Sequence, residues 1–293
     1  MAAAARDSKI DLSGQVALIT GGSGGLGRAF ALALAAAGAK VAVMARTQPG
    51  LAETVESIGR AGGRALPLAG DVARAPDVAR AVATAEQHFG SVDILVNSAG
   101  SPIAGSFGYD WNVDPQAWWD TFEINMRGPF LCARAVLPGM IQRRRGRIVN
   151  VSSRAAFTAL PQMDALCASK AALTHWTRCL AAGTQAHGIA LFALSPGVVR
   201  TPATERLAAA PEVPKEVGER YRALFSQALD TPVARVAQKV LFLVSGKADA
   251  LSGRFIQVED DEDDLVRRAA EIRRDDLHIL TLRTGTPSVK PRR

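Results

Sequence analysis

Short apolar runs alternate with stretches of helical periodicity along the chain from Val16 to Val258. The apolar runs are not interrupted by regularly spaced polar residues, which is typical of strands that helices cover on both faces. Seven such runs predict strands at 15–20, 40–46, 64–72, 92–100, 147–153, 188–197 and 253–258. The intervening periodic stretches predict helices at 27–39, 52–63, 75–90, 114–146, 163–182 and 233–246. This order predicts an α/β fold.

The same order predicts how the sheet is built. Repeated strand–helix units are typical of a Rossmann-type doubly wound parallel sheet, here of about seven strands, with helices on both faces. No linker rich in Pro, Gly or Ser divides the pattern, so we expect a single domain at 12–258. Residues 1–11 are expected to form a mobile N-terminal segment. Residues 259–293 are expected to form a C-terminal extension with an acidic run, a docked helix and a flexible tail.

The acidic run Glu259–Asp264 could suggest a metal site. Acidic residues before a helix more often stabilise its N-terminus, and the arginines that follow provide ion-pair partners. We therefore predict no metal there or elsewhere in the chain.

Composition limits the compartment and the partners. The 293 residues are 48% hydrophobic, which is enough for one large core. No apolar run has the length of a membrane span, and the N-terminus lacks the pattern of a secretory signal. The three cysteines are an odd number without metal-ligand spacing, so neither disulfides nor a zinc site is expected. We predict a cytoplasmic protein without a membrane partner.

The formal charge of +7 raises the alternative of nucleic-acid binding. The main basic cluster, at 142–147, falls at a predicted helix-to-strand turn, where it favours the helix C-terminus. No aromatic stacking pattern or nucleic-acid motif accompanies it. We therefore expect a small-molecule substrate and no nucleic acid.

The segment Thr20–Gly27, "TGGSGGLG", connects the first predicted strand to the first helix. Phosphate binding requires close backbone approach and free N–H groups, and a glycine-rich turn at a helix N-terminus offers both. A glycine cluster alone is a weak signal, because the glycines could serve only as turns. Its place after the first strand favours a dinucleotide site.

Three further motifs follow in order: "GDV" with Asp71, "NSAG" from Asn97, and "SPGVVRT" from Ser195 to Thr201. On these motifs and the glycine turn, the chain from about Leu12 to Val258 resembles the classical short-chain dehydrogenase/reductase family. The resemblance implies that Asp71 and its neighbour contact the adenine, and that the last motif contacts the nicotinamide carboxamide. The implied cofactor-binding residues are Gly21, Ser23, Gly25, Leu26, Gly27, Asp71, Val72, Asn97, Ala99, Gly100, Lys170, Pro196, Gly197, Val199 and Thr201.

The residue after the second strand bears on the choice of cofactor. An acidic residue there would bind the ribose 2′-hydroxyl of NAD, but this chain has Arg46, which can pair with a 2′-phosphate. We therefore expect NADP to be preferred over NAD. Gly24 departs from the resemblance, since NADP-preferring relatives often have a second basic residue at its position.

The resemblance also implies a catalytic tetrad, of which one member is missing. Asn125 matches the asparagine that holds a lysine-bound water, Ser153 the serine that binds the substrate carbonyl, and Lys170 the lysine that binds the nicotinamide ribose. The tyrosine position, four residues before Lys170, is Leu166. Leucine cannot donate a proton, and general acid catalysis is typically worth about 10²–10⁴-fold. Tyr109, in the loop after the fourth strand, is a weak candidate for a substitute.

Three functions remain open. The first is an NAD(P)-dependent oxidoreductase that acts on a carbonyl or hydroxyl group of a medium-sized, partly apolar substrate. The second is a non-redox enzyme, such as an isomerase, cyclase or lyase, and the third is an inactive cofactor-binding regulatory subunit. The apolar faces at 118–137 and 171–182 are larger than one subunit is expected to cover, so we predict a homo-oligomer, either a tetramer or a dimer.

Overall fold

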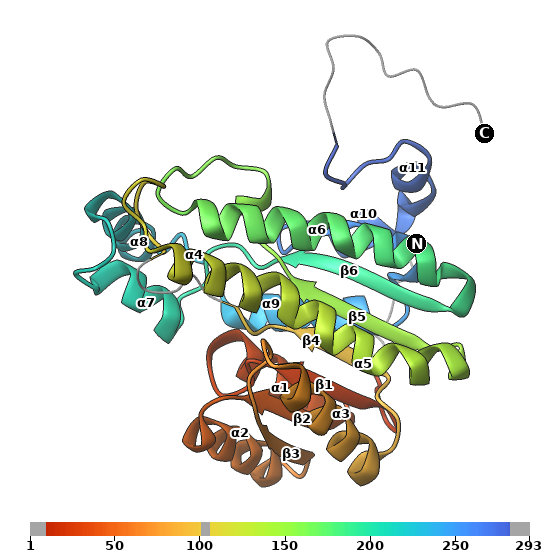
Figure 1. Cartoon of the computed structure of the whole chain (residues 1–293). Helices are drawn as coiled ribbons and strands as arrows, with labels where there is room; N and C mark the ends of the chain where they lie inside the picture. Colours follow the sequence, from red (N-terminus) through yellow and green to blue (C-terminus); the bar gives the residue numbers. More distant parts are fainter. Residues whose placement is uncertain (1–9, 101–105, 282–293) are drawn as a thin grey trace.

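The computed structural model describes residues 10–100 and 106–281, and its centre is a parallel sheet (Figure 1). The strands lie in the order β3-β2-β1-β4-β5-β6-β7, and each pairs in parallel with its neighbours. Their bounds are β1 Val16–Thr20, β2 Lys40–Ala45, β3 Arg64–Ala69, β4 Ile94–Asn97, β5 Gly146–Val151, β6 Ile189–Ser195 and β7 Phe255–Gln257. The seven-stranded Rossmann-type fold predicted from the sequence is confirmed.

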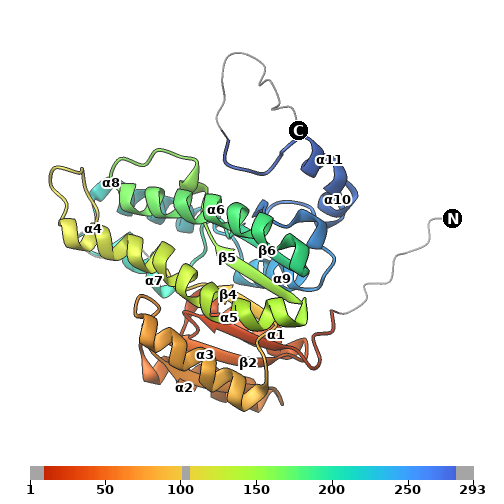
Figure 2. The same ribbon diagram turned by 45° about the vertical axis from the view of Figure 1, so that its right-hand side comes forward.

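Helices cover both faces of this sheet (Figure 2). Apolar residues of α1 (Gly25–Ala36), α2 (Gln48–Arg60) and α9 (Val233–Val244) form a core on one face. Residues of α3 (Ala75–Phe89), α5 (Gly128–Arg143) and α6 (Asp164–Thr184) form a second core on the other. Because both faces are covered, the strands are largely apolar, as the uninterrupted runs in the sequence predicted.

The prediction of one continuous helix at 114–146 is wrong, because the stretch is divided into three helical segments. It consists of α4 (Pro115–Phe122), a π-helical segment at Glu123–Arg127, and α5. Pro129 has no N–H to donate to the carbonyl of Asn125, four residues earlier, so regular α-helical pairing cannot continue there. The π segment contains Asn125, and such segments are frequent at functional sites.

Two helices lie beyond the carboxyl end of β6. They are α7 (Pro202–Ala209) and α8 (Lys215–Ser226), which occupy the insertion between β6 and α9. Leu207, Val213 and Val217 of this insertion form an apolar cluster with Met163, at the start of α6. The cluster fixes the two helices over the carboxyl ends of the strands (Figure 1).

The C-terminal extension is packed against the domain as far as His278. It contains two short helices, α10 (Glu262–Arg267) and α11 (Ala269–Arg274), where the sequence predicted one. Buried Lys239 on α9 donates to the carbonyl of Asp260 at 2.6 Å and pairs with Glu262 at 3.2 Å. Phe255 N donates to His278 O at 2.8 Å, so the extension also covers the outer edge of β7.

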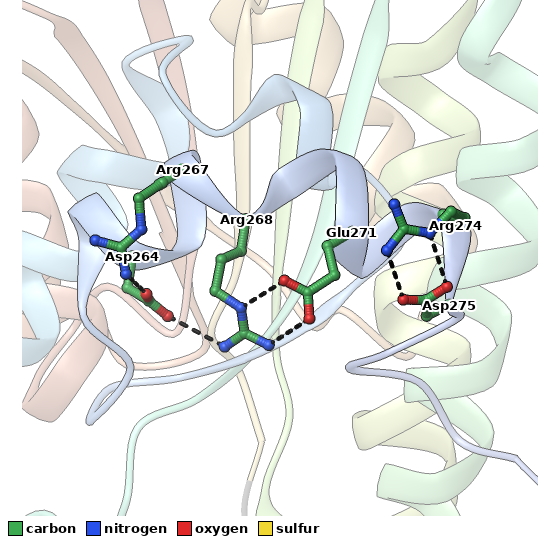
Figure 3. A network of polar contacts seen from close by, with 6 residues as sticks. All are labelled: Asp264, Arg267, Arg268, Glu271, Arg274 and Asp275. Atoms are coloured by element: carbon green, nitrogen blue, oxygen red, sulfur yellow. Dashed lines mark hydrogen bonds and ion pairs between the residues drawn. The ribbon is translucent and has the colours of Figure 1, made fainter.

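The acids of the extension pair with arginines, as Figure 3 shows. Arg268 binds both Asp264 and Glu271, and Arg274 binds Asp275. Arg267 also donates to Asp264. The acidic run therefore serves, at least in part, as ion-pair partners for the arginines that follow.

The first described residues of the chain contact the domain. Ile10, within the segment predicted to be mobile, packs against the core, and Leu12 N donates to Ala37 O at 2.7 Å. Residues 1–9 and the predicted flexible tail from 282 onward lie outside the described residues. Within the described ranges, no helix combines the length and the apolar character that crossing a bilayer requires.

Candidate active site

The predicted site residues gather at one edge of the sheet because the strands are parallel. The registers align Thr20 with Asn97, and Asn97 with Asn150, so β1, β4 and β5 end at the same level. The segments after these strands and after β2, β3 and β6 contain most of the predicted cofactor-binding residues. In a doubly wound sheet this carboxyl edge is where ligands bind.

The glycine-rich turn after β1 is packed against the end of β4. The Thr20 hydroxyl accepts hydrogen bonds from Ser98 N and Ala99 N, both at 3.1 Å. Gly21 has a φ of +71°, and a Cβ built on it would lie 2.9 Å from Ala99 N. A Cβ on Gly27 would lie 2.3 Å from Gly21 O, so α1 can approach the turn only with glycine at that position.

The N-terminus of α1 is suited to an anion. Among the described residues no side chain caps it, and its first turn has no acidic residue, so the first N–H groups and the positive end of the helix dipole can bind an anion. Arg28 donates to Ser23 O at 2.9 Å and pairs with Glu53 at 2.7 Å. Thr54 donates to Gly22 O at 2.8 Å. These contacts fix a cradle that fits the pyrophosphate of a dinucleotide.

The predicted adenosine side lies after β2 and β3. Arg46 follows β2 directly and is exposed, with no hydrogen bond or ion pair to any described residue. The Asp71 carboxylate accepts from Ala73 N at 2.9 Å, which fixes the turn after β3. Val72 is buried beneath Gly128, where a Cβ would lie 2.9 Å from its side chain. The arrangement leaves the Arg46 guanidinium available for a ligand.

The segment after β6 reaches back to the glycine turn. Gly197 has a φ of +72°, which turns the chain after buried Pro196. Thr201 caps α7 by accepting from Thr204 N at 3.3 Å. A Cβ on Gly25 would lie 3.6 Å from the Thr201 side chain, so the first and last cofactor motifs are neighbours in space.

Asn125 and Lys170 meet next to Gly100. Asn125 Nδ2 donates to Ser169 Oγ at 3.1 Å, and Ser169 donates in turn to Leu166 O at 3.0 Å. This contact orients the amide so that Asn125 Oδ1 lies on the side of Gly100. A Cβ built on Gly100 would lie 2.6 Å from Asn125 Oδ1 and 3.3 Å from Lys170 Nζ. Asn125 Oδ1 is buried with no partner among the described residues, which fits an acceptor for a ligand or water.

Lys170 is buried in α6, with 7% of its surface exposed. Its ammonium donates to Val151 O at 2.7 Å. Burial lowers the pKa of Lys170 from 10.5 to about 8, because the charged form loses hydration. A buried ammonium at the edge of a ligand site is suited to bind hydroxyl groups, as the resemblance implies for the ribose.

A cavity of about 650 Å³ opens next to Leu166, one helical turn before Lys170. Ser153 lines it, and the Ser153 hydroxyl accepts from Ala155 N at 3.1 Å, which leaves its proton free to bind a ligand oxygen. Leu166 also lines the cavity and packs against the apolar cluster of Met163, Leu207, Val213 and Val217. Leu166, at the position of the family's tyrosine, therefore forms part of the apolar wall of the cavity.

Both tyrosines of the chain line the same cavity. Tyr109 is 44% exposed and stacks on Trp111 with ring centroids 4.9 Å apart. Tyr221, on α8, is half-buried, and burial raises the pKa of its phenol. The sequence favoured Tyr109 as a substitute acid, and the structure adds Tyr221 as a second candidate.

Several supporting residues had no recognisable signal in the sequence. Thr54, Arg28 and Ser169 act through contacts between segments far apart in the chain. Ser152 is buried and bonds to Thr174 at 2.7 Å, so it faces away from the cavity that Ser153 lines. Ser152 and Ser153 continue the chain just beyond β5, and in extended backbone successive side chains point to opposite sides.

Comparison with known proteins agrees with this geometry. The model of the family described as short chain dehydrogenase matches residues 15–212. A short chain dehydrogenase of Pseudocercospora fijiensis is 43% identical over 190 residues, which are 65% of this chain and 61% of that protein. The 2-(S)-hydroxypropyl-CoM dehydrogenase 3 of Xanthobacter autotrophicus is 36% identical, over 85% of this chain and 96% of its own.

Solved structures of similar fold include a ketoreductase. A single-residue variant of the actinorhodin polyketide ketoreductase, solved with NADPH, superposes with a TM-score of 0.75 at 31% identity. The superposition covers 83% of this chain and 95% of the ketoreductase.

Proposed function

Because the chain belongs to the short-chain dehydrogenase family of oxidoreductases, which bind NAD or NADP, we propose that it transfers a hydride between NADP and a carbonyl or hydroxyl group of a medium-sized, partly apolar substrate. The observation that carries the proposal is that Asn125 and Lys170 meet next to Gly100, one helical turn from Leu166, which lines the same cavity as Ser153. When bound, the nicotinamide exchanges a hydride with the substrate carbon.

The residues of the chain have distinct roles in this proposal. The N-terminus of α1 binds the pyrophosphate, and Lys170 binds the ribose next to the nicotinamide. Ser153 donates a hydrogen bond to the substrate oxygen, which stabilises the negative charge that develops there during reduction. Asn125 Oδ1 accepts from a water near Lys170, which places a proton source beside the site.

Leu166 determines how the proton reaches the substrate oxygen. Leucine can neither donate nor accept a proton, so the donor must be water or one of the phenols that line the cavity, Tyr109 or Tyr221. Loss of the usual acid lowers the rate by about 10²–10⁴-fold if nothing replaces it. The leucine at position 166 also favours a second candidate function, that of a subunit that binds the cofactor without turnover.

The preference for NADP is supported by Arg46. Its guanidinium is exposed directly after β2 and has no partner among the described residues, so it can pair with a 2′-phosphate. Arg28 is held by Glu53 and by Ser23 O, and it is thus less free to contribute. One similar structure, the actinorhodin ketoreductase, contains NADPH.

We also propose a homo-oligomer, a dimer or a tetramer, that pairs through α5 and α6. Phe130 and Ile141 on α5 are 44% and 37% exposed, and Phe130 contacts Trp176 of α6 edge to face at 6.2 Å. Exposed aromatic and aliphatic groups on adjacent helices are typical of a subunit contact. Light scattering should give at least twice the 30.9 kDa mass of one chain, and a monomer would refute the proposal.

Two measurements in sequence test the function. Fluorescence titration with NADPH and NADH tests whether a cofactor binds and which is preferred. Single-turnover absorbance at the nicotinamide band, with excess protein and a ketone, then tests hydride transfer. Binding with loss of absorbance supports the oxidoreductase, while binding without any loss supports the inactive subunit.

A further inference from the structure

The cavity beside Ser153 has two arginines from separate segments in its lining. Arg154 follows Ser153 directly, after β5, and Arg220 lies on α8. Neither guanidinium has an ion pair or hydrogen bond to any residue in the ranges 10–100 and 106–281. Two cations thus line one ligand-sized space, and within the described ranges neither forms an ion pair with an acidic side chain.

Two nearby arginines, Arg200 and Arg222, are bound by other residues of the protein. Arg200 pairs with Glu205 at 2.9 Å and lies over the ring of Phe225 at 5.4 Å. Arg222, two residues after Arg220, donates to the carbonyl of Ala208. Contacts within the insertion between β6 and α9 therefore occupy these two arginines, which do not line the cavity.

One acidic residue, Glu216, also lines the cavity. It lies one helical turn before Arg220, but the two side chains do not approach within ion-pair distance. Instead, Glu216 accepts from Gln162 Nε2 at 3.5 Å. With two guanidinium groups and one carboxylate, the charged side chains of the lining have a net charge of about +1 at neutral pH.

Arg220 and Tyr221 are adjacent on α8, and both line the cavity. Burial raises the pKa of Tyr221, and the charge of Arg220 opposes this rise by favouring the phenolate. Arg220 and Tyr221 thus place a cation and a phenol in the lining of one cavity.

The rest of the lining is largely apolar. It includes Leu160, Met163, Leu166, Val217 and Leu224. A ligand that matches this lining has an apolar body and a negatively charged group. The apolar side chains exclude water from the apolar body, and the guanidinium groups bind the negative charge.

We propose that the cavity selects substrates that have an oxyanion group, a carboxylate or a sulfonate, in addition to the carbonyl or hydroxyl that reacts, and that Arg220 and Arg154 bind this group. The proposal rests on the proposed function only for the reacting group. Binding of the oxyanion depends on the two arginines and does not require turnover. Guanidinium groups bind such anions through charge-assisted, often bidentate hydrogen bonds.

The test compares three ketones of similar shape: 4-acetylbenzoate, 4-acetylbenzenesulfonate and the neutral 4-acetylbenzamide. Calorimetry measures the affinity of each for the full-length protein, with and without NADPH. We expect the two anions to bind about 10-fold or more tightly than the amide, which corresponds to one charge-assisted contact. The ratio of the affinities for 4-acetylbenzoate and 4-acetylbenzenesulfonate identifies which oxyanion the site prefers.

Arg220→Ala and Arg154→Ala should each reduce this preference by about 3-fold or more, since each removes one of two guanidinium groups. Arg206→Ala is the matched control, because Arg206 is an exposed arginine on α7 outside the cavity lining. It removes the same net charge and should leave the preference unchanged. Thermal unfolding of each variant checks that it is folded, and Arg220→Gln provides a second variant if Arg220→Ala is not.

Equal affinity for anions and amide would overturn the proposal, as would undetectable binding of all three ketones at millimolar concentration. A preference that Arg206→Ala reduces as much as Arg220→Ala would reveal only a general effect of charge, and would also overturn it. The proposed function is tested separately by NADPH consumption. Preferential binding of the anions without NADPH consumption would refute the redox activity and support the oxyanion site. Equal reduction of all three ketones would support the redox activity and refute the oxyanion site.

Discussion

Replacement of Lys170 by methionine should stabilise the cofactor-free protein at neutral pH. Methionine keeps most of the length of the side chain and removes the buried ammonium. Burial lowers the pKa of Lys170 from 10.5 to about 8, and at about 1.36 kcal/mol per pH unit this corresponds to about 3 kcal/mol. The substitution also removes the hydrogen bond to Val151 O, worth about 1 kcal/mol. The free energy of unfolding should therefore rise by about 2 kcal/mol at pH 7.

The effect of Lys170 on the free energy of unfolding depends on pH. The pKa of Lys170 is lower in the folded state, so between about pH 8 and 10.5 the unfolded chain binds more protons. Lys170 therefore makes the free energy of unfolding of the wild type rise with pH across this window, and its destabilising effect is fully present below about pH 8. Lys170→Met lacks this contribution, so its advantage over the wild type should shrink as the pH rises toward 10.5.

Urea unfolding, followed by tryptophan fluorescence at about pH 7 and about pH 9.5, measures both effects at a fixed protein concentration. Lys247→Met, at an exposed lysine, is the control and should change the free energy of unfolding by less than about 0.5 kcal/mol. NADPH affinity should fall in Lys170→Met and not in the control. A variant less stable than the wild type at neutral pH, or a difference independent of pH, would refute the reasoning.

Three other substitutions test the site. Leu166→Tyr should raise NADPH-dependent ketone reduction by about 10-fold or more in steady-state assays, whereas Leu166→Phe, which adds the ring without the hydroxyl, should not. If another residue already delivers the proton, both rings should lower the activity, and an unchanged rate with intact NADPH binding would argue against hydride chemistry in this cavity. Arg46→Ala should weaken NADPH binding about 10-fold and change NADH binding less than about 2-fold in fluorescence titrations, and equal losses would contradict the role of Arg46. Gly27→Ala should reduce both the melting temperature and cofactor binding, because its Cβ would lie 2.3 Å from Gly21 O, and wild-type behaviour in both would contradict the packing argument.

Much of the fold could be predicted because it depends on local patterns. Uninterrupted apolar runs such as Val16–Thr20 mark strands buried on both faces, and their alternation with helical periodicity determines a parallel sheet. The π-helical segment at Glu123–Arg127 was not predicted, since it depends on how Pro129 and the packing of Asn125 disrupt a pattern that is otherwise helical. The two short helices of the extension were predicted as one because the break between them, at Arg268, has no Pro or Gly to mark it in the sequence.

The site was predictable in part. Motifs located Gly21, Asn125 and Lys170 in sequence, and the fold brings them to one edge of the sheet in space. The contributions of Arg220 and Tyr221 depend on how α8 lies over the cavity. That placement comes from apolar packing between segments far apart in the chain, for which a single sequence has no local pattern.

The most direct test of the account is single-turnover reduction by the wild-type protein, with Leu166 in place. Excess protein is mixed with NADPH deuterated at the transferred position and with a panel of aryl ketones that includes 4-acetylbenzoate, and the products are analysed by mass spectrometry. If the protein is an oxidoreductase, the nicotinamide absorbance should fall slowly and the product should be an alcohol with deuterium on its carbinol carbon. Bound NADPH with unchanged absorbance and no deuterated alcohol from any ketone would contradict this activity.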